Sequence, residues 1–113
     1  MPLRGNESED KACVYLKERG YRILARNWRT RTGEIDIIAR DEGILVFVEV
    51  KARSSSGFGG PEAAVDHAKQ RRIISAALSF MQATECALPT RFDVVAIRPG
   101  NVRLYQDAFQ ATN

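Results

Sequence analysis

Cysteine, histidine and long apolar runs are scarce in this chain of 113 residues. Its two cysteines, Cys13 and Cys86, are too few and too far apart for a disulfide framework, and they lack the paired spacing of a zinc site. We therefore expect two reduced thiols. The longest apolar run, Ile44 to Val48, is far shorter than the roughly 20 residues that cross a bilayer, and the first residues contain no signal-peptide pattern. These absences favour a cytoplasmic protein with no membrane partner.

Internal repeats and low-complexity linkers are also absent, so we treat residues 1–113 as a single domain. Hydrophobic residues make up 44% of the chain and charged residues 27%, a balance that excludes a disordered or collagen-like protein. Seventeen Lys and Arg residues against fourteen Asp and Glu residues give a net charge of +3. This modest excess favours a polyanionic partner over an acidic, calcium-binding one.

Capping signals predict two helices. The first is capped by Asn6 or Ser8, continues with apolar residues at helical spacing, and stops at Gly20. The second occupies much of residues 62–82, with Pro61 in its first turn. A long serine- and glycine-rich loop precedes the second helix.

Runs rich in β-branched and alternating apolar residues predict five strands, at residues 21–28, 34–40, 44–51, 92–97 and 102–105. The third is nearly continuous in apolar residues, which is typical of a central strand covered on both faces. In the second, period-2 alternation places Ile35, Ile37 and Ala39 on one face and Glu34, Asp36 and Ile38 on the other. The order of elements predicts an α/β or α+β sandwich around a mixed sheet.

Charge appears at the end of this most apolar strand, where Glu49 lies between two valines and Lys51 follows on the same face. Burying Glu49 without a partner would be costly. A divalent metal ion is one compensating partner, because Mg²⁺ prefers the oxygen ligands that Asp and Glu supply.

The register of the hairpin before this strand decides which charges meet. A turn centred on residues 42–43 places Asp36 opposite Glu49, where two carboxylates repel unless a cation lies between them. The same register places Glu34 opposite Lys51. A three-residue loop would instead turn Asp36 to the other face, unless a bulge restored it.

The string GEIDIIARDEGILVFVEVKAR, preceded by residues 20–28, closely resembles the YraN-like family of small bacterial proteins. Later segments that resemble the same family are Phe58-Gly59, Val65-Asp66, Lys69-Gln70-Arg71-Arg72 and residues 91–95. That family is grouped with restriction-endonuclease-like nucleases, whose hallmark is an Asp followed on the next strand by Glu-x-Lys. It is also similar in layout to archaeal Holliday-junction resolvases. The resemblance therefore implies an α/β (α+β) fold with a central mixed sheet flanked by helices, in the order αβββαββ.

The resemblance also implies a set of site residues. The implied catalytic side chains are Asp36, Glu49, Lys51 and Glu34. The implied ligands of Mg²⁺ or Mn²⁺ are Asp36, Glu49, the Val50 carbonyl and Glu9. Lys51 would position or help deprotonate the attacking water and stabilise charge on the phosphate. One departure is that Ile35 precedes Asp36, where the superfamily motif has a proline.

Five basic residues and one glutamine around this acidic centre are expected to contact nucleic acid, namely Lys69, Gln70, Arg29, Arg31, Arg53 and Arg72. A basic surface with a small acidic centre is typical of a metal-dependent nuclease. The expected function is therefore a Mg²⁺-dependent endonuclease that hydrolyses phosphodiester bonds in DNA. Branched or single-stranded DNA is the substrate that analogy suggests, in repair or recombination. A further alternative is that activity appears only in a homodimer or together with a partner protein.

Other interpretations stand beside this one. The strand charges are also consistent with ordinary cross-strand ion pairs, and Glu9 with a favourable interaction with the helix dipole. His67 is either a general base or a solvated residue. Trp28 and Phe58 either stack on bases or anchor the core and the loop. The alternative function is a non-catalytic nucleic-acid-binding or adaptor protein that retains the nuclease fold.

Overall fold

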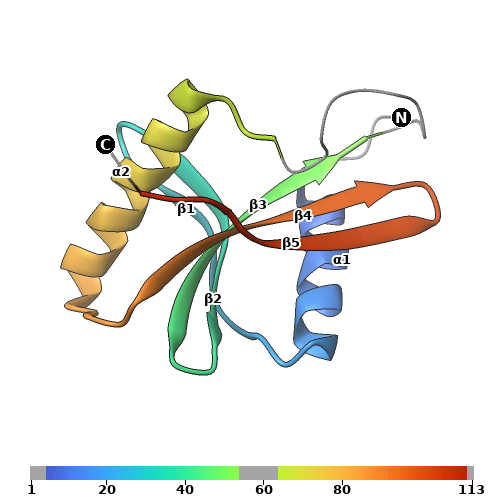
Figure 1. Ribbon diagram of the computed structural model, residues 1–113, viewed down its shortest axis with the longest axis horizontal. Helices are drawn as coiled ribbons and strands as arrows, with labels where there is room; N and C mark the ends of the chain where they lie inside the picture. The colour runs from blue at the N-terminus through green and yellow to red at the C-terminus, as the bar shows by residue number, and fades with distance from the viewer. Residues whose placement is uncertain (1–4, 54–63, 112–113) are drawn as a thin grey trace.

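A five-stranded mixed sheet lies between two helices in the computed structural model, which describes residues 5–53 and 64–111 (Figure 1). The elements in chain order are α1 (Gly5–Glu18), β1 (Arg22–Arg29), β2 (Glu34–Asp41), β3 (Ile44–Ala52), α2 (His67–Thr84), β4 (Thr90–Arg98) and β5 (Asn101–Phe109). The strands lie in the sheet in the same order as in the chain, and only β3 and β4 are parallel. This α+β fold with the order αβββαββ is the one expected, and it is consistent with a restriction-endonuclease-like fold.

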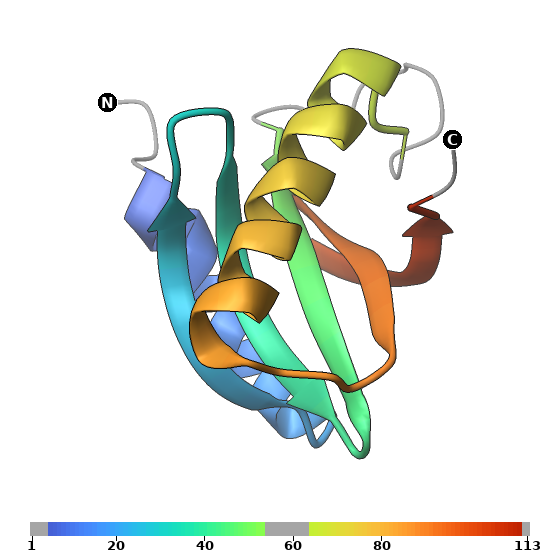
Figure 2. The ribbon, with the colours of Figure 1, turned by 90° about the vertical axis from the view of Figure 1, so that its left-hand side faces the viewer.

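The two helices cover opposite faces of the sheet, as a second view across the sheet shows (Figure 2). On one face, α1 packs Ala12, Cys13 and Leu16 against β2, β3 and β4. On the other face, the buried residues of α2 are Ile73, Ala76, Ala77 and Phe80. The central strand β3 is therefore covered from both sides, which explains its nearly continuous apolar sequence.

Trp28 belongs to the core beneath α2. Its ring packs edge-on against Phe80, with centroids 5.3 Å apart. The core interpretation of this tryptophan is therefore confirmed. Both cysteines are free, with Cys13 buried beneath α1 and Cys86 half-buried after α2.

The first helix ends where the sequence predicts but begins earlier. Gly20 adopts a left-handed φ of 91°, and the N–H of Tyr21 donates to the carbonyl of Leu16 at 3.0 Å. This is the glycine-terminated helix end that the sequence predicts. The predicted caps, Asn6 and Ser8, are wrong, because α1 already includes both positions. Ser8 is only 4% exposed, so its side chain packs within the fold and does not cap the start of the helix.

The second helix begins at His67, later than the predicted start near Pro61. Asp66 is its N-cap, and the Asp66 side chain accepts a hydrogen bond from the N–H of Lys69 at 2.8 Å. The predicted start was wrong because Asp66, a residue type favoured at helix caps, was assigned to the helix interior.

The β2–β3 hairpin has the register on which the site depends. Its turn is made by residues 42–43, and the pairs extend to Ile37 opposite Val48. Continuing this register by one position places Asp36 opposite Glu49. The two-residue turn and the pairs from Asp41–Ile44 to Ile37–Val48 are therefore confirmed, whereas the predicted pairs Asp36–Glu49 and Glu34–Lys51 lie beyond the end of this ladder.

Side chains do not alternate regularly around Asp36. Ile37 packs against α1, whereas Ile35, two residues earlier, packs on the α2 side. The prediction that Ile35 and Ile37 share a face is therefore wrong. In the neighbouring strand, Asn27 has a left-handed φ of 55°, and Trp28 after it also packs on the α2 side. A local left-handed residue of this kind breaks the period-2 pattern.

The last strand extends over residues 101–109 instead of the predicted 102–105. Its pairing with β4 shifts register near Asp93, whose side chain is fully buried and accepts the N–H of Asp107 at 2.9 Å. Asp107 has a φ of 56°. The strand was predicted too short because this irregular region, held by a side chain, does not alternate.

Some expectations concern parts of the chain that the structure leaves undescribed. The serine- and glycine-rich loop, with Phe58 and Pro61, lies outside the described residues. Within the described part of the chain, no helix is long and apolar enough to span a membrane.

Candidate functional site

Two carboxylates from neighbouring strands lie together where the β2–β3 ladder ends. Oδ2 of Asp36 accepts a hydrogen bond from the N–H of Val50 at 2.8 Å, in the place of a regular strand-to-strand bond. Glu49 is 5% exposed, and its carboxylate lies close enough to Asp36 to act on the pKa of that carboxyl. Burial, and next the charge of Glu49, raise the pKa of Asp36 from 3.8 to about 7. The pair therefore favours a bound proton or a cation.

A third carboxylate, that of Glu9 on α1, is near enough to act on Asp36 through its charge. Its charge adds to the rise in the pKa of Asp36, and the residue is only 7% exposed. Its Oε1 atom is buried and accepts no hydrogen bond within the described residues. The nearest cation, Nη2 of Arg26, is 3.7 Å away, which is too far for a hydrogen bond. A buried acceptor without a donor is rare in native proteins and marks a place that suits a cation or a water.

One cation of the chain itself already contacts the acidic pair. Nζ of Lys69, in the first turn of α2, lies 2.5 Å from Oε2 of Glu49. Burial opposes its charge, but the hydrogen bond to Glu49 raises the pKa of Lys69 above its usual value. Helix α2, which connects β3 to β4, therefore supplies a positive charge that compensates the carboxylate of Glu49.

Lys51 lies two residues beyond Glu49 on β3 and is half-buried. Burial lowers the pKa of Lys51, and the nearby charge of Arg53 lowers it further. No hydrogen bond or ion pair engages its ammonium within residues 5–53 and 64–111. A lysine with a lowered pKa beside buried carboxylates is suited to proton transfer.

The donor set for a metal ion is sparse. Within the described residues, no group of three or more His, Cys, Asp and Glu side chains is arranged to hold a metal ion. Glu34, which the sequence added to the set, is exposed and pairs instead with Arg29 at 3.3 Å. Asp36 and Glu49 remain, with the Val50 carbonyl between them in the chain. This set fits Mg²⁺, which keeps several waters and takes one or two carboxylates together with substrate phosphate.

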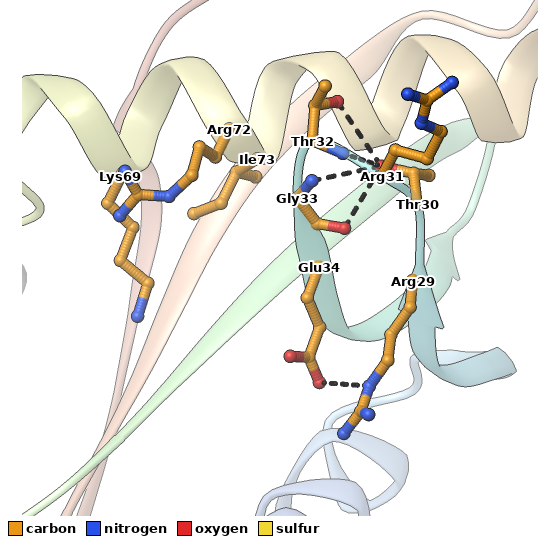
Figure 3. Close-up of a pocket in the computed structure, with 9 residues that line it drawn as sticks. All are labelled: Arg29, Thr30, Arg31, Thr32, Gly33, Glu34, Lys69, Arg72 and Ile73. Carbon is orange, nitrogen blue, oxygen red and sulfur yellow. Dashed lines mark hydrogen bonds and ion pairs between the residues drawn. The ribbon is translucent and has the colours of Figure 1, made fainter.

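A pocket of about 500 Å³ opens between the β1–β2 hairpin and α2 (Figure 3). Its lining residues are Arg29, Thr30, Arg31, Thr32, Gly33, Glu34, Lys69, Arg72 and Ile73. Lys69 belongs both to this lining and to the ion pair with Glu49, so the pocket adjoins the acidic pair.

The structure divides the six residues predicted to bind nucleic acid. The four that line the pocket are Arg29, Arg31, Lys69 and Arg72. Arg53 lies outside the pocket, close enough to Lys51 to lower its pKa. The side-chain amide of Gln70 donates to the carbonyl of Val65 at 2.7 Å, and Gln70 lines a different groove of α2, with His67. A DNA contact from Gln70 and a catalytic role for His67, which is exposed there, stay predictions.

Two features of the structure are not predicted from the sequence. The first is the contact that joins the hairpin to α2: a Cβ atom on Gly33 would meet the carbonyl oxygen of Arg72. The hydroxyl of Thr32 also hydrogen-bonds that of Ser75 at 2.6 Å. Nothing in the sequence links these positions.

The second is a buried polar network around Asp93, which lies on β4 beside Val48 of β3. Asp93, with no exposed surface, accepts hydrogen bonds from Tyr21 at 2.8 Å and from both nitrogens of Arg91 that face it. Arg91 also reaches Asp41 at 2.9 Å. Burial raises the pKa of Tyr21 to about 12. A charged residue within an apolar strand, the signal that singles out Glu49, also marks Asp93.

These features define an α+β protein with a largely buried acidic pair where the β2–β3 ladder ends and a basic pocket beside it. A family model described as "Uncharacterised protein family UPF0102" matches residues 8–97. The chain belongs to this family, which is the YraN-like family that its sequence resembles.

Curated relatives of the same family match along nearly their whole length. A UPF0102 protein of Persephonella marina is 45% identical over 108 residues, covering 95% of this chain and 93% of the relative. A UPF0102 protein of Lachnoclostridium phytofermentans is 47% identical, covering 96% of this chain and 94% of the relative. A UPF0102 protein of Symbiobacterium thermophilum is 48% identical, covering 95% and 96%. The family match over residues 8–97 spans the positions of the candidate site, from Glu9 to Lys69.

Proposed function

We propose that this protein is a metal-dependent nuclease that hydrolyses phosphodiester bonds in DNA. The observation that carries the proposal is the pair of the half-buried Asp36 and the buried Glu49, with the unpaired ammonium of Lys51 two residues further along β3. Burying two adjacent carboxylates is costly unless a cation or a proton compensates them. The basic pocket beside the pair supplies the second requirement, which is a place for a polyanion.

In this proposal Asp36, Glu49 and the Val50 carbonyl hold Mg²⁺ or Mn²⁺, and Glu9 supports the charge of the ion from α1. A divalent ion there supplies positive charge against the phosphate and lowers the pKa of a bound water. Lys51 orients the attacking water, and its lowered pKa suits it to exchange a proton with that water. Its charge also offsets the charge that builds up on the phosphate.

Cleavage of labelled DNA in Mn²⁺ or Mg²⁺ tests the proposal. We expect the wild-type protein to cut at least one of four substrates: single-stranded, duplex, flapped or four-way-branched DNA. Asp36→Asn and Lys51→Met should abolish the cleavage, as should EDTA. Glu42→Gln is the matched control for Asp36→Asn, and Lys17→Met is the matched control for Lys51→Met. Each control removes an exposed charge of the same sign as its site residue, far from the acidic pair. Equal cleavage by the wild type and both site variants would refute the assignment.

A non-catalytic nucleic-acid-binding protein is the second candidate. It is favoured by the absence, within the described residues, of a third side-chain ligand beside Asp36 and Glu49. It is also favoured by Lys69, which already compensates Glu49 without a metal ion. Titration with Mn²⁺ separates the two candidates. Binding of Mn²⁺ that disappears in Asp36→Asn supports the nuclease, whereas salt-sensitive DNA binding without any Mn²⁺ site supports the second candidate. A requirement for a homodimer would appear as activity that rises with the square of protein concentration.

A further inference from the structure

The pocket between the β1–β2 hairpin and α2 carries more positive charge than compensation of the acidic pair requires. Its lining contains four cations and one carboxylate, a net charge equal to the +3 of the whole chain. Arg72 and Arg31 make no ion pair or hydrogen bond within the described residues. The ion pair of Arg29 with Glu34 is long, at 3.3 Å, and the Arg29 side chain is 74% exposed. The guanidinium groups of Arg31 and Arg72 are therefore free to bind an anion, and that of Arg29 is held only by this exposed ion pair.

The size and closure of the pocket limit what can enter. About 500 Å³ lies within the range of roughly 300–1,000 Å³ that holds a small ligand. The hairpin tip closes one end, because Gly33 packs directly on the backbone of Arg72 and Thr32 bonds to Ser75. Figure 3 shows Lys69 and Arg72 extending from the helix into the space beside the hairpin. A duplex, whose major groove alone is about 12 Å wide, does not fit such a space, but one or two unpaired nucleotides do.

The polar groups of the pocket favour backbone and base-face contacts over base-edge recognition. The hydroxyl of Thr30 is engaged by the N–H groups of Thr32 and Gly33, and that of Thr32 by Ser75. The remaining donors are guanidinium and ammonium groups, which bind phosphates and stack on the faces of unpaired bases. Recognition of this kind is tolerant of sequence.

We propose that this pocket binds one or two unpaired nucleotides of the substrate strand, independently of their sequence. Lys69 lines the pocket and contacts Glu49, so a strand held there leads directly to the acidic pair. The substrate class is then nucleic acid with a single-stranded segment next to the cleaved bond: a flap, an overhang or an open single strand. This inference rests on the proposed nuclease function.

Binding without metal tests the pocket separately from catalysis. The full chain is titrated in EDTA against fluorescein-labelled oligothymidylate and against a blunt duplex of the same length, with fluorescence anisotropy as the readout. Arg72→Gln and Arg29→Gln remove pocket charges. Arg71→Gln is the control on α2, because Arg71 lines a different groove, and Arg22→Gln is the control on β1, at the opposite end of the strand.

We expect the wild type to bind the single strand more tightly than the duplex. Each pocket variant should weaken single-strand binding about five-fold and reduce the slope of log K against log salt by about 0.7, with the controls unchanged. Equal losses in Arg72→Gln and Arg71→Gln would overturn the proposal, and so would equal affinity of the wild type for single strand and duplex.

The same substrates then separate the two proposals. If single strands bind through the pocket residues but no DNA is cleaved in Mn²⁺, the proposed nuclease function is refuted and the proposed nucleotide-binding pocket is supported. If cleavage in Mn²⁺ needs no unpaired segment and is unchanged in Arg72→Gln, the proposed role of the pocket is refuted and the proposed nuclease function is supported.

Discussion

Nζ of Lys69 lies 2.5 Å from Oε2 of Glu49, although the two side chains differ widely in exposure, at 45% and 5%. The buried partner belongs to the central strand, and the exposed partner belongs to the helix that crosses from β3 to β4. An external cation that binds Glu49 therefore competes with a cation of the chain itself. This relationship makes the helix part of the acidic centre.

Lys69→Gln should make binding of Mn²⁺ tighter by about five-fold, because it removes a competing positive charge from Glu49. The same substitution leaves Glu49 buried without its partner, so the metal-free protein should also unfold at a lower urea concentration. Isothermal titration with Mn²⁺ and urea unfolding in EDTA measure the two effects. Lys17→Gln, which removes an exposed charge from the last turn of α1, is the control. Weaker binding of Mn²⁺ in Lys69→Gln would contradict the competition.

Asp36→Asn should stabilise the metal-free protein, and more strongly at pH 8 than at pH 5. Burial and the charge of Glu49 raise the pKa of Asp36 from 3.8 to about 7, so between these values the native state binds more protons than the unfolded state. The contribution of Asp36 to stability is therefore fully present below about pH 4 and is lost as the pH rises to about 7. Asparagine resembles the protonated form at every pH. Urea unfolding in EDTA at both pH values measures the difference.

The exposed turn residue Glu42 supplies the control for this experiment, as Glu42→Gln removes a carboxylate with no buried neighbour. A gain in Asp36→Asn that is the same at pH 5 and pH 8 would show that the carboxyl of Asp36 does not titrate in this range.

Arg91→Met should cost about 3–5 kcal/mol of unfolding free energy, because it leaves the fully buried Asp93 without its cation. Arg91 is itself only 15% exposed and also pairs with Asp41, so solvent screens these contacts little. Urea unfolding at neutral pH measures the loss. Arg22→Met, at an exposed position of β1, should change the free energy by less than about 0.5 kcal/mol. Equal effects of the two substitutions would mean that the ion pairs of Arg91 with Asp93 and Asp41 do not contribute to the free energy of unfolding.

Gly33→Ala should destabilise the fold by about 1–3 kcal/mol, since its Cβ would lie 2.1 Å from the carbonyl oxygen of Arg72. Gly43→Ala is the matched control, because no atom lies within 4 Å of the Cβ it would add. Thermal unfolding compares the two variants. If the hairpin moves away from α2 to relieve the contact, binding of oligothymidylate should weaken in Gly33→Ala alone. Identical melting temperatures would show that the hairpin does not pack on the helix in solution.

The elements around the acidic pair could be predicted because each depends on neighbouring residues. The two-residue turn and the apolar pattern of β3 together define the hairpin register, and Gly20 marks the end of α1. Placement of Asp36 opposite Glu49 then follows from counting, without any long-range information.

What could not be predicted depends on contacts between distant residues or on unusual backbone conformations. The left-handed Asn27 changes the face of the residues that follow it, which a period-2 count cannot include. The ion pair of Glu34 with Arg29 joins β2 to β1, which the count along the β2–β3 hairpin does not include. Likewise, the contact of Gly33 with α2 joins segments that are remote in the sequence.

The order of the strands has a consequence for how the molecule refolds. Asp36 and Glu49 lie on one hairpin, which closes locally, whereas Lys69 arrives only when the long parallel crossover is complete. During refolding, we therefore expect the two like charges to meet before their counter-ion is in place. Mildly acidic solution or millimolar divalent salt should remove this electrostatic barrier and accelerate refolding of the chain.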